Sequence, residues 1–231
     1  MLAVENINTY YWDRHVLWNL SLTVPQGRAV AMLGRNGMGK TTIIRSIMGL
    51  TPPADGVIRF KGKPINGLEP FRIARKGISL VPQGRCVFPS LSVKENLLIG
   101  ARGTNGKGTW NLDRIYSLFP ILKERQGFHA NLLSGGEQQM LAIARSLMTN
   151  PDLLIMDEPS EGLAPMVIKQ IGTVICELKG RLTVFLAEQN LNMALSVADY
   201  VYIVSKGSIV FEGGPEDLRH DEETKQKWLG V

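Results

Sequence analysis

The chain has 231 residues, of which 44% are hydrophobic and 20% charged, a composition typical of a soluble globular protein. The net charge of +5 comes without a dense block of Lys or Arg, so the sequence argues against a nucleic-acid partner. No apolar stretch approaches the roughly 18 residues that a membrane span needs, and the first residues do not resemble a secretory signal. Any role at a membrane is therefore expected to come through a partner.

Apolar runs typical of strands alternate with segments typical of helices, which predicts a layered α/β fold. The expected strands cover 2–7, 16–24, 28–33, 57–60, 78–81, 153–156 and 182–187, and a hairpin of 200–204 and 208–211 follows. A helix is expected over 41–48, and the tail from Pro215 is expected to be polar and helical. Residues 92–149 are the most helical part, with a surface loop at 100–108. We predict one domain over 1–231, with 92–149 as a helical subdomain inserted into its α/β core.

Residues 34–41 read GRNGMGKT and fit the phosphate-loop pattern G-x-x-x-x-G-K-[ST] between an apolar strand and a helix. The glycines let the backbone aim its N–H groups at phosphate oxygens, and the helix N-terminus adds a favourable dipole. Lys40 is predicted to reach the β- and γ-phosphates, and the Thr41 hydroxyl to ligate Mg²⁺. The alternative, a glycine turn with an incidental lysine, is disfavoured by the flanking strand and helix. The candidate nucleotide-binding residues here are Gly34, Asn36, Gly37, Gly39, Lys40, Thr41 and Thr42.

A second apolar strand, 153–156, is followed by the two carboxylates Asp157 and Glu158. Sites in α/β proteins gather at the C-terminal ends of such strands. Asp157 is predicted to hold Mg²⁺, directly or through water, and Glu158 to orient and polarise an attacking water as general base. Two acids after a strand can also merely cap the next helix, but the phosphate loop in the same chain favours the catalytic interpretation.

Residues 133–138 read LSGGEQ and precede an amphipathic helix. Ser134 and Glu137 predict a capping box, so an ordinary helix start is one interpretation. Gly135 and Gly136 also leave bare N–H groups at the positive end of the helix, which predicts an anion site.

The string LSGGE resembles the LSGGQ signature of the ABC ATPase family, and the resemblance covers essentially the whole chain. It implies the P-loop NTPase fold of ABC ATPases, with an antiparallel β subdomain and an inserted α-helical subdomain. It also implies ATP and Mg²⁺ as cofactors, and a head-to-tail dimer with a second ATPase subunit, identical or different. In that dimer Ser134, Gly135 and Gly136 contact the ATP held by the other subunit.

Further positions match the family pattern in chain order. Tyr11 resembles the aromatic residue that stacks on adenine, although an ordinary core or edge-strand role is equally open. Gln83 resembles the Q-loop glutamine, which touches Mg²⁺ and the attacking water, and 160–165 occupies the D-loop position at the dimer seam. Gln189 departs from the pattern, because the family usually has a histidine there. A glutamine can hydrogen-bond a γ-phosphate but carries no proton or charge, so we expect Glu158 to act as base with Gln189 as a neutral sensor.

The strings 34–37, 81–85, 160–165 and 188–190 resemble the second ATPase of branched-chain amino acid importers and its relative in urea or short-chain amide importers. This implies a place on the cytoplasmic side of the membrane, transmembrane permease subunits as partners, and a periplasmic or extracellular binding protein acting indirectly. The apolar Phe88 and Pro89 are expected on a surface, 84–90, that receives a permease loop, with core packing as the alternative for Phe88.

Two other functions are less well supported by the sequence. A soluble ABC ATPase that acts on DNA or ribosomes usually carries a long coiled-coil insertion or two cassettes, and this sequence has neither. A degenerate cassette that only binds nucleotide would lack Lys40, Glu158 or the signature, and all are present.

Overall fold

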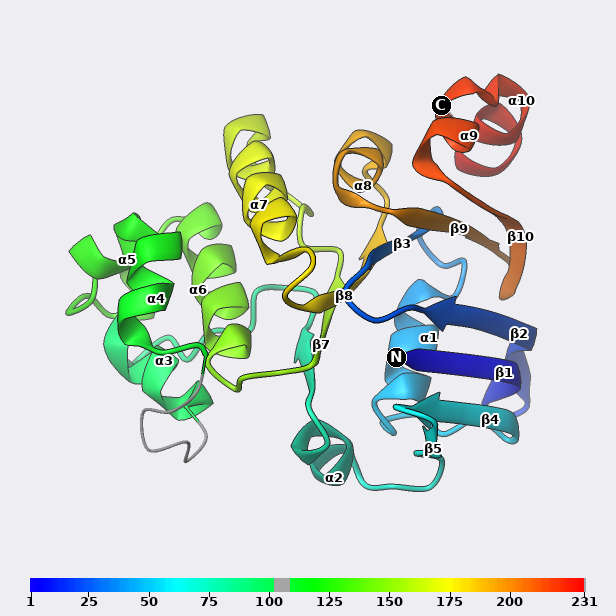
Figure 1. Cartoon of the computed structure of the whole chain (residues 1–231), viewed down its shortest axis with the longest axis horizontal. Helices are drawn as coiled ribbons and strands as arrows, with labels where there is room; N and C mark the ends of the chain where they lie inside the picture. The colour runs from blue at the N-terminus through cyan, green and yellow to red at the C-terminus, as the bar shows by residue number, and fades with distance from the viewer. Residues whose placement is uncertain (102–108, 231) are drawn as a thin grey trace.

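The computed structural model describes residues 1–101 and 109–230, which form two β-sheets flanked by helices (Figure 1). The first sheet has the order β2-β1-β4-β5 and the second β10-β9-β3-β8-β7-β6. The strands are β1 (Leu2–Tyr11), β2 (Arg14–Val24), β3 (Ala29–Leu33), β4 (Asp55–Phe60), β5 (Lys63–Pro64), β6 (Ile78–Val81), β7 (Leu153–Asp157), β8 (Thr183–Glu188), β9 (Tyr200–Ser205) and β10 (Ser208–Gly213).

Helices follow most of the strands from β3 onward, and several come together between β6 and β7. The α-helices are α1 (Lys40–Ile47), α2 (Pro70–Arg75), α3 (Val93–Gly100), α4 (Leu112–Leu118), α5 (Pro120–Glu124), α6 (Gly135–Leu147), α7 (Pro165–Leu178), α8 (Leu191–Val197), α9 (Pro215–His220) and α10 (Glu222–Thr224). A 3₁₀ turn covers Ala130–Leu132 and a π turn covers Lys225–Leu229. Within residues 1–101 and 109–230, no helix is both long and apolar enough to cross a membrane.

The centre of the second sheet is parallel and wholly buried. Every residue of β3, β7 and β8 is buried, which explains why these strands read as continuous apolar runs. β8 lies between β3 and β7, with Leu33 opposite Glu188 and Asp157 opposite Ala187. The loops that follow β3, β7 and β8 therefore start side by side at one edge of the sheet.

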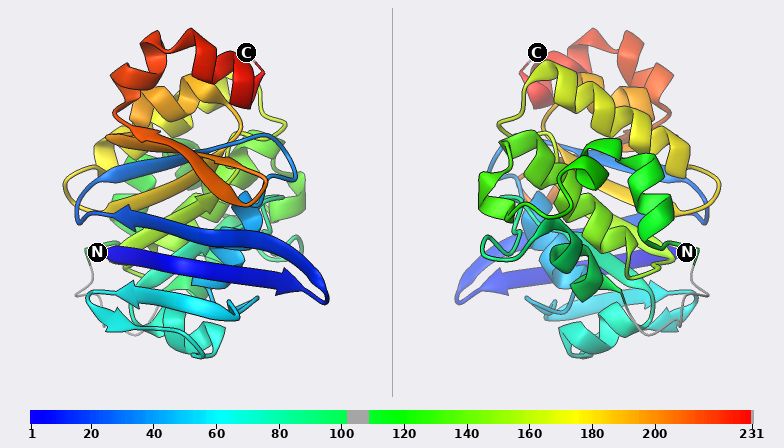
Figure 2. Two further views of the ribbon diagram at one scale, coloured as in Figure 1. Left: turned by 90° about the vertical axis from the view of Figure 1, so that its right-hand side faces the viewer. Right: turned by 90° about the vertical axis from the view of Figure 1, so that its left-hand side faces the viewer.

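Two large apolar clusters hold the layers together. One lies between the four-stranded sheet, α1 and the central strands, with Leu17, Ile43 and Ile155 among its members. The other joins α6 and α7 to the opposite side of the same strands, through residues such as Leu141 and Ile175. Helices α3 to α6 come between β6 and β7 in the chain and gather on the side of the molecule away from β1, β2 and β4 (Figures 1 and 2).

Some element boundaries differ from those predicted. β1 continues to Tyr11, because a register shift around Asn6, at φ 50°, interrupts the apolar alternation without ending the pairing. α2 was not expected, since it buries only Ile73 and so lacks an amphipathic pattern. Gly100 ends α3 instead of starting a loop, and residues 102–108 of that predicted loop lie outside the described part of the chain. The hairpin of β9 and β10 is confirmed as an antiparallel pair.

Candidate active site

The glycine-rich loop after β3 is held by close backbone packing. A Cβ added to Gly34 would lie 2.6 Å from the carbonyl oxygen of Val204, so no larger residue fits there. Gly39 has φ 110°, a conformation that L side chains rarely adopt, and its position lies against Leu17 of β2. Gly39 precedes α1 and supplies no side-chain cap. Among residues 1–101 and 109–230, the first N–H groups of α1 therefore have neither a helical nor a side-chain partner, which is the arrangement that binds phosphate.

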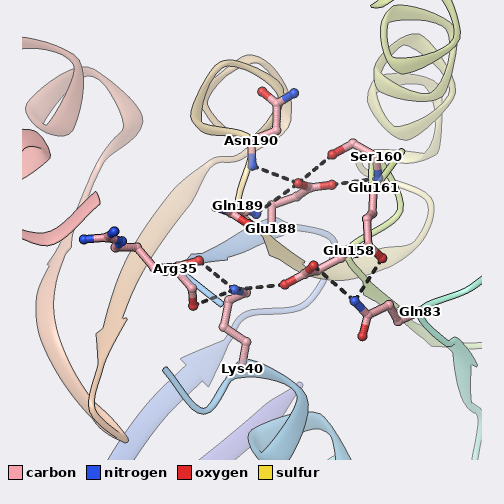
Figure 3. Close-up of polar contacts among 10 residues, drawn as sticks. Arg35, Lys40, Gln83, Glu158, Ser160, Glu161, Glu188, Gln189 and Asn190 are labelled. Atoms are coloured by element: carbon pink, nitrogen blue, oxygen red, sulfur yellow. Dashed lines mark hydrogen bonds and ion pairs between the residues drawn. The ribbon is translucent and has the colours of Figure 1, made fainter. Parts of the chain in front are cut away.

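Lys40 is buried, and oxygen atoms surround its ammonium group (Figure 3). Nζ donates to the carbonyl oxygens of Gly34 at 2.6 Å and Arg35 at 3.1 Å, and lies 2.9 Å from Oε1 of Glu158. These partners compensate the charge of a lysine that is only 3% exposed. Phosphate oxygens in the loop would compete for the same ammonium.

Glu158 follows β7 and has φ 48°, a left-handed conformation that is uncommon for a residue with a side chain. Its backbone N–H donates to the carbonyl of Ala187 at 2.9 Å, which anchors this turn to β8. Its carboxylate lies between Lys40 and Gln83, whose Nε2 is 3.4 Å from Oε2. Gln83 also donates to Oε2 of Glu161 at 2.9 Å. The predicted base and the predicted Q-loop glutamine are thus in contact.

Asp157, the last residue of β7, is 3% exposed. Its Oδ1 is buried without a hydrogen-bond partner in the described part of the protein. Burial raises the pKa of the Asp157 carboxyl, and the neighbouring Thr41 hydroxyl opposes that shift. A carboxylate oxygen without a partner, next to a hydroxyl, is a set of hard oxygen donors of the kind that Mg²⁺ prefers. These residues therefore fit Mg²⁺.

Two adjacent cavities lie at this edge of the sheet, and Glu158 lines both. One, of about 270 Å³, is lined by Val16, Asn36, Gly37, Gly39, Lys40, Thr41, Thr42, Gln83 and Glu158. The other, of about 320 Å³, is lined by Glu158, Ser160, Glu161, Gly162, Glu188, Gln189 and Asn190. Most of the predicted phosphate-loop residues share the first cavity, whereas Gln189 lies in the second with the D-loop.

Tyr11 and the signature residues lie elsewhere. Tyr11 is the last residue of β1, partly buried, and does not line either of these cavities. Ser134 and Gly136 line a separate cavity of about 600 Å³, between α7 and the start of α6. The predicted capping box is present, since Ser134 Oγ accepts from the Glu137 N–H and Glu137 Oε2 accepts from the Ser134 N–H. Within one chain, the signature does not line the phosphate-loop cavity.

Glu188 was not singled out from the sequence, although it is one of the most highly connected carboxylates of the site. It is 1% exposed at the end of β8, and burial raises its pKa. It accepts hydrogen bonds from Ser160, Gln189 and Asn190 (Figure 3). The available signal was a single acidic residue closing an otherwise apolar strand.

Known proteins resemble this chain along its whole length. A family model described as ABC transporter matches residues 17–161. The high-affinity branched-chain amino acid transport ATP-binding protein BraG of Pseudomonas aeruginosa is 42% identical, with 100% of both chains covered. The probable branched-chain amino acid transport ATP-binding protein LivF of Archaeoglobus fulgidus is 32% identical, covering 100% of this chain and 99% of that protein. The lipopolysaccharide export system ATP-binding protein LptB of Haemophilus influenzae is 34% identical, covering 100% and 97%.

Solved structures give the same result for the fold. The ADP conformation of an ATP-binding cassette of an ABC transporter matches with a TM-score of 0.86 at 29% identity, covering 100% of this chain and 97% of the other. A nucleotide-free cassette matches with a TM-score of 0.81 at 30% identity, covering 95% and 93%. Family model, full-length relatives and fold agree with the phosphate loop and the buried acids at the sheet edge. The chain therefore belongs to the ABC transporter family, as one of its ATP-binding subunits with ATPase activity.

Proposed function

We propose that this ATPase drives an importer for branched-chain amino acids. The observation that carries the proposal is the 42% identity to BraG over the full length of both chains. The glutamine at position 189, where the wider family usually has histidine, supports the same subgroup. In this proposal the chain acts on the cytoplasmic side of the membrane, bound to transmembrane permease subunits. A periplasmic or extracellular binding protein delivers the substrate to the permease and does not contact this chain.

Each residue of the site has a separate role in ATP binding or hydrolysis. The loop amides and Lys40 bind the phosphates, and Tyr11 stacks on the adenine. Thr41, Asp157 and Gln83 hold Mg²⁺, which when bound neutralises charge on the phosphates. Glu158 accepts the proton of the attacking water. The Glu158 carboxylate forms an ion pair with Lys40 at 2.9 Å. Phosphates that bind Lys40 would release this carboxylate, which then accepts the proton of the water.

A second ATPase subunit completes the site. Ser134 and the amides of Gly135 and Gly136 contact the ATP of the other subunit, and Gln189 hydrogen-bonds its own γ-phosphate. Within one chain, the signature residues line a different cavity from the phosphate loop, which supports this arrangement. The signature and the phosphate loop can contact the same nucleotide only if they come from two subunits of a dimer. In the importers that this chain resembles the partner is usually a different ATPase, and the dimer is either of two such subunits or of two copies of this chain.

The permease contacts the surface formed by 84–90, next to the inserted helical subdomain 92–149. Phe88 is 45% exposed, so the alternative of core packing does not apply to it. Its ring lies 4.9 Å from the Arg145 guanidinium, and its backbone N–H donates to Asn96 Oδ1 at 2.9 Å. An exposed aromatic on a backbone anchored to α3 and α6 suits a contact that moves these helices.

The test of the mechanism is ATP hydrolysis by the purified chain and by Glu158→Gln. We expect the variant to lose at least about 100-fold in turnover and to become a stable dimer with ATP in size-exclusion chromatography. Glu223→Gln, an exposed carboxylate on α10, is the matched control and retains the wild-type rate. Normal turnover in Glu158→Gln would refute the assignment of the base.

The substrate is tested in cells that lack this gene. Loss of leucine uptake that the wild-type gene restores, and Glu158→Gln does not, supports the proposal. Loss of urea or short-chain amide uptake instead would assign the chain to that second importer group. Unchanged uptake of both would contradict an import role of either kind.

A further inference from the structure

Glu188 lies where two loops of the site meet. β8 ends at Glu188, and Gln189 and Asn190 lead directly into α8, whose N-cap is Asn190. The D-loop, 160–165, follows Glu158 and leads into α7. These loops are distant in the chain, yet both line the cavity that Glu158 shares with them.

The carboxylate of Glu188 accepts hydrogen bonds from both loops. Oε1 accepts from the Ser160 N–H at 3.0 Å, and Oε2 accepts from the Ser160 hydroxyl at 2.8 Å. Oε2 also accepts from the N–H groups of Gln189 at 3.1 Å and Asn190 at 3.0 Å. All these partners donate, and an ionised carboxylate is the side chain that accepts at both oxygens. Figure 3 shows this network beside the Lys40–Glu158 pair.

Burial makes this network rigid and sensitive to change. Glu188 is 1% exposed and Ser160 is 7% exposed, so water has little access to replace a lost bond. The turn that bears Glu158 is tied to the same strand, because its N–H donates to the carbonyl of Ala187, the residue before Glu188. A shift of the D-loop therefore pulls on the base and on the Gln189 segment together.

We propose that Glu188 is a positioning residue for ATP hydrolysis, which joins the D-loop to the Gln189 segment so that both move with Glu158. The proposal rests on the roles of Glu158, Gln189 and the D-loop in the function proposed above. Glu188 touches neither phosphate nor water in this role, and acts through the loops. Its loss is expected to lower kcat and to leave ATP binding nearly unchanged.

The first experiment is a double-mutant cycle with Glu188→Gln and Ser160→Ala, measuring kcat, KM and the affinity for a fluorescent ATP analogue. Glutamine keeps the volume of the side chain but replaces one accepting oxygen with a donor. We expect each single variant to lose about tenfold in kcat with KM within about twofold, and the double variant to lose little more. Glu188→Asp, which keeps both oxygens, is expected to recover part of the rate.

Asp199→Asn is the matched control. This carboxylate also holds a strand, because Oδ2 accepts from the Ala29 N–H at 2.8 Å, and it pairs with Lys179 at 3.1 Å. It lines neither cavity at the sheet edge, so its loss is expected to lower stability without changing kcat. A fall in kcat in Asp199→Asn as large as that in Glu188→Gln would show that general loosening, not positioning, explains the effect.

Amide hydrogen exchange of the nucleotide-free chain provides a readout that does not depend on turnover. Glu188→Gln is expected to speed exchange at Ser160, Gln189 and Asn190 together, without faster exchange in β3. Unchanged exchange at these amides, additive losses in the cycle, or an effect on KM alone would overturn the proposal. If Glu158→Gln retains activity while the exchange and the cycle behave as expected, the base assignment fails and the link through Glu188 stands.

Discussion

Helices α1 and α6 both start at glycine-rich strings, but their first turns are satisfied in different ways. α1 follows Gly39, at φ 110°, and has no side-chain cap, while α6 follows Ser134, whose hydroxyl accepts from the Glu137 N–H at 3.3 Å. The Glu137 carboxylate in turn accepts from the Ser134 N–H at 2.7 Å. The first turn of α6 is thus partly satisfied within the protein, whereas the N–H groups of the first turn of α1 are open to a ligand. In the proposed function, the start of α1 holds a nucleotide and the start of α6 presents a preformed surface to one.

The largest test of this comparison is Lys40→Ala at the start of α1. We expect ATP turnover to fall by about 100-fold or more, because the charged donor to the phosphates is lost and Glu158 loses its 2.9 Å partner. Turnover and binding of a fluorescent ATP analogue measure the effect. Lys94→Ala, an exposed lysine on α3, is the control and should keep the wild-type values. Intact turnover in Lys40→Ala would show that α1 does not hold the nucleotide.

The next test places a methyl group at the start of α1. Gly39→Ala puts a Cβ 3.1 Å from Leu17 Cδ2 and 3.4 Å from Gly207 Cα, in a backbone conformation that already disfavours it. We expect a loss of about 1–3 kcal/mol in unfolding free energy by denaturant titration, together with weaker ATP binding. Gly62→Ala also has a positive φ, of 75°, but no atom within 4 Å, so it measures the cost of a positive φ without a packing clash. Equal effects of the two variants would exclude a contribution from packing in the loop.

A smaller effect on stability is expected at α6. Ser134→Ala removes one capping box, and Ser92→Ala removes the corresponding one from α3. Both are expected to lose about 1 kcal/mol in unfolding free energy. Only Ser134→Ala is expected to lower ATP turnover, by about tenfold, because in the proposed dimer its hydroxyl also contacts the ATP of the other subunit. If both variants hydrolyse ATP equally well, Ser134 serves only as a helix cap.

The smallest expected effect is on the pH dependence of stability. Because burial raises the pKa of Asp157, the folded protein binds this proton more tightly than the unfolded chain. Stability from this group is present below the ordinary value near 3.8 and is lost as pH rises through the raised value. Thermal unfolding of Asp157→Asn across this range should show a less negative slope with pH than the wild type. An unchanged slope would contradict the raised pKa of Asp157.

Several local features were predictable because they depend on neighbours in the chain. The S-x-x-E string at Ser134 forms the predicted capping box, and the same string at Ser92 forms another. The apolar face of α6 is buried, including Leu141, Ala144 and Leu147. The strand–loop–helix setting of the phosphate loop is present as well. The ends of β1 and the existence of α2 were not predictable, since a bulge and a mostly exposed helix leave no regular apolar period.

The sequence by itself indicated the candidate residues for the chemistry, because phosphate loops, acidic strand ends and helix caps are short, contiguous strings. Only the tertiary structure decided which of these residues lie next to one another. The pairing of Leu33 with Glu188 and of Asp157 with Ala187 brings three strand ends together, and that register is not encoded in any one of the strands. The bonds between Glu188 and Ser160 join residues 28 positions apart. Such contacts depend on how separate strands align in a buried sheet, and the alignment is a property of the whole core.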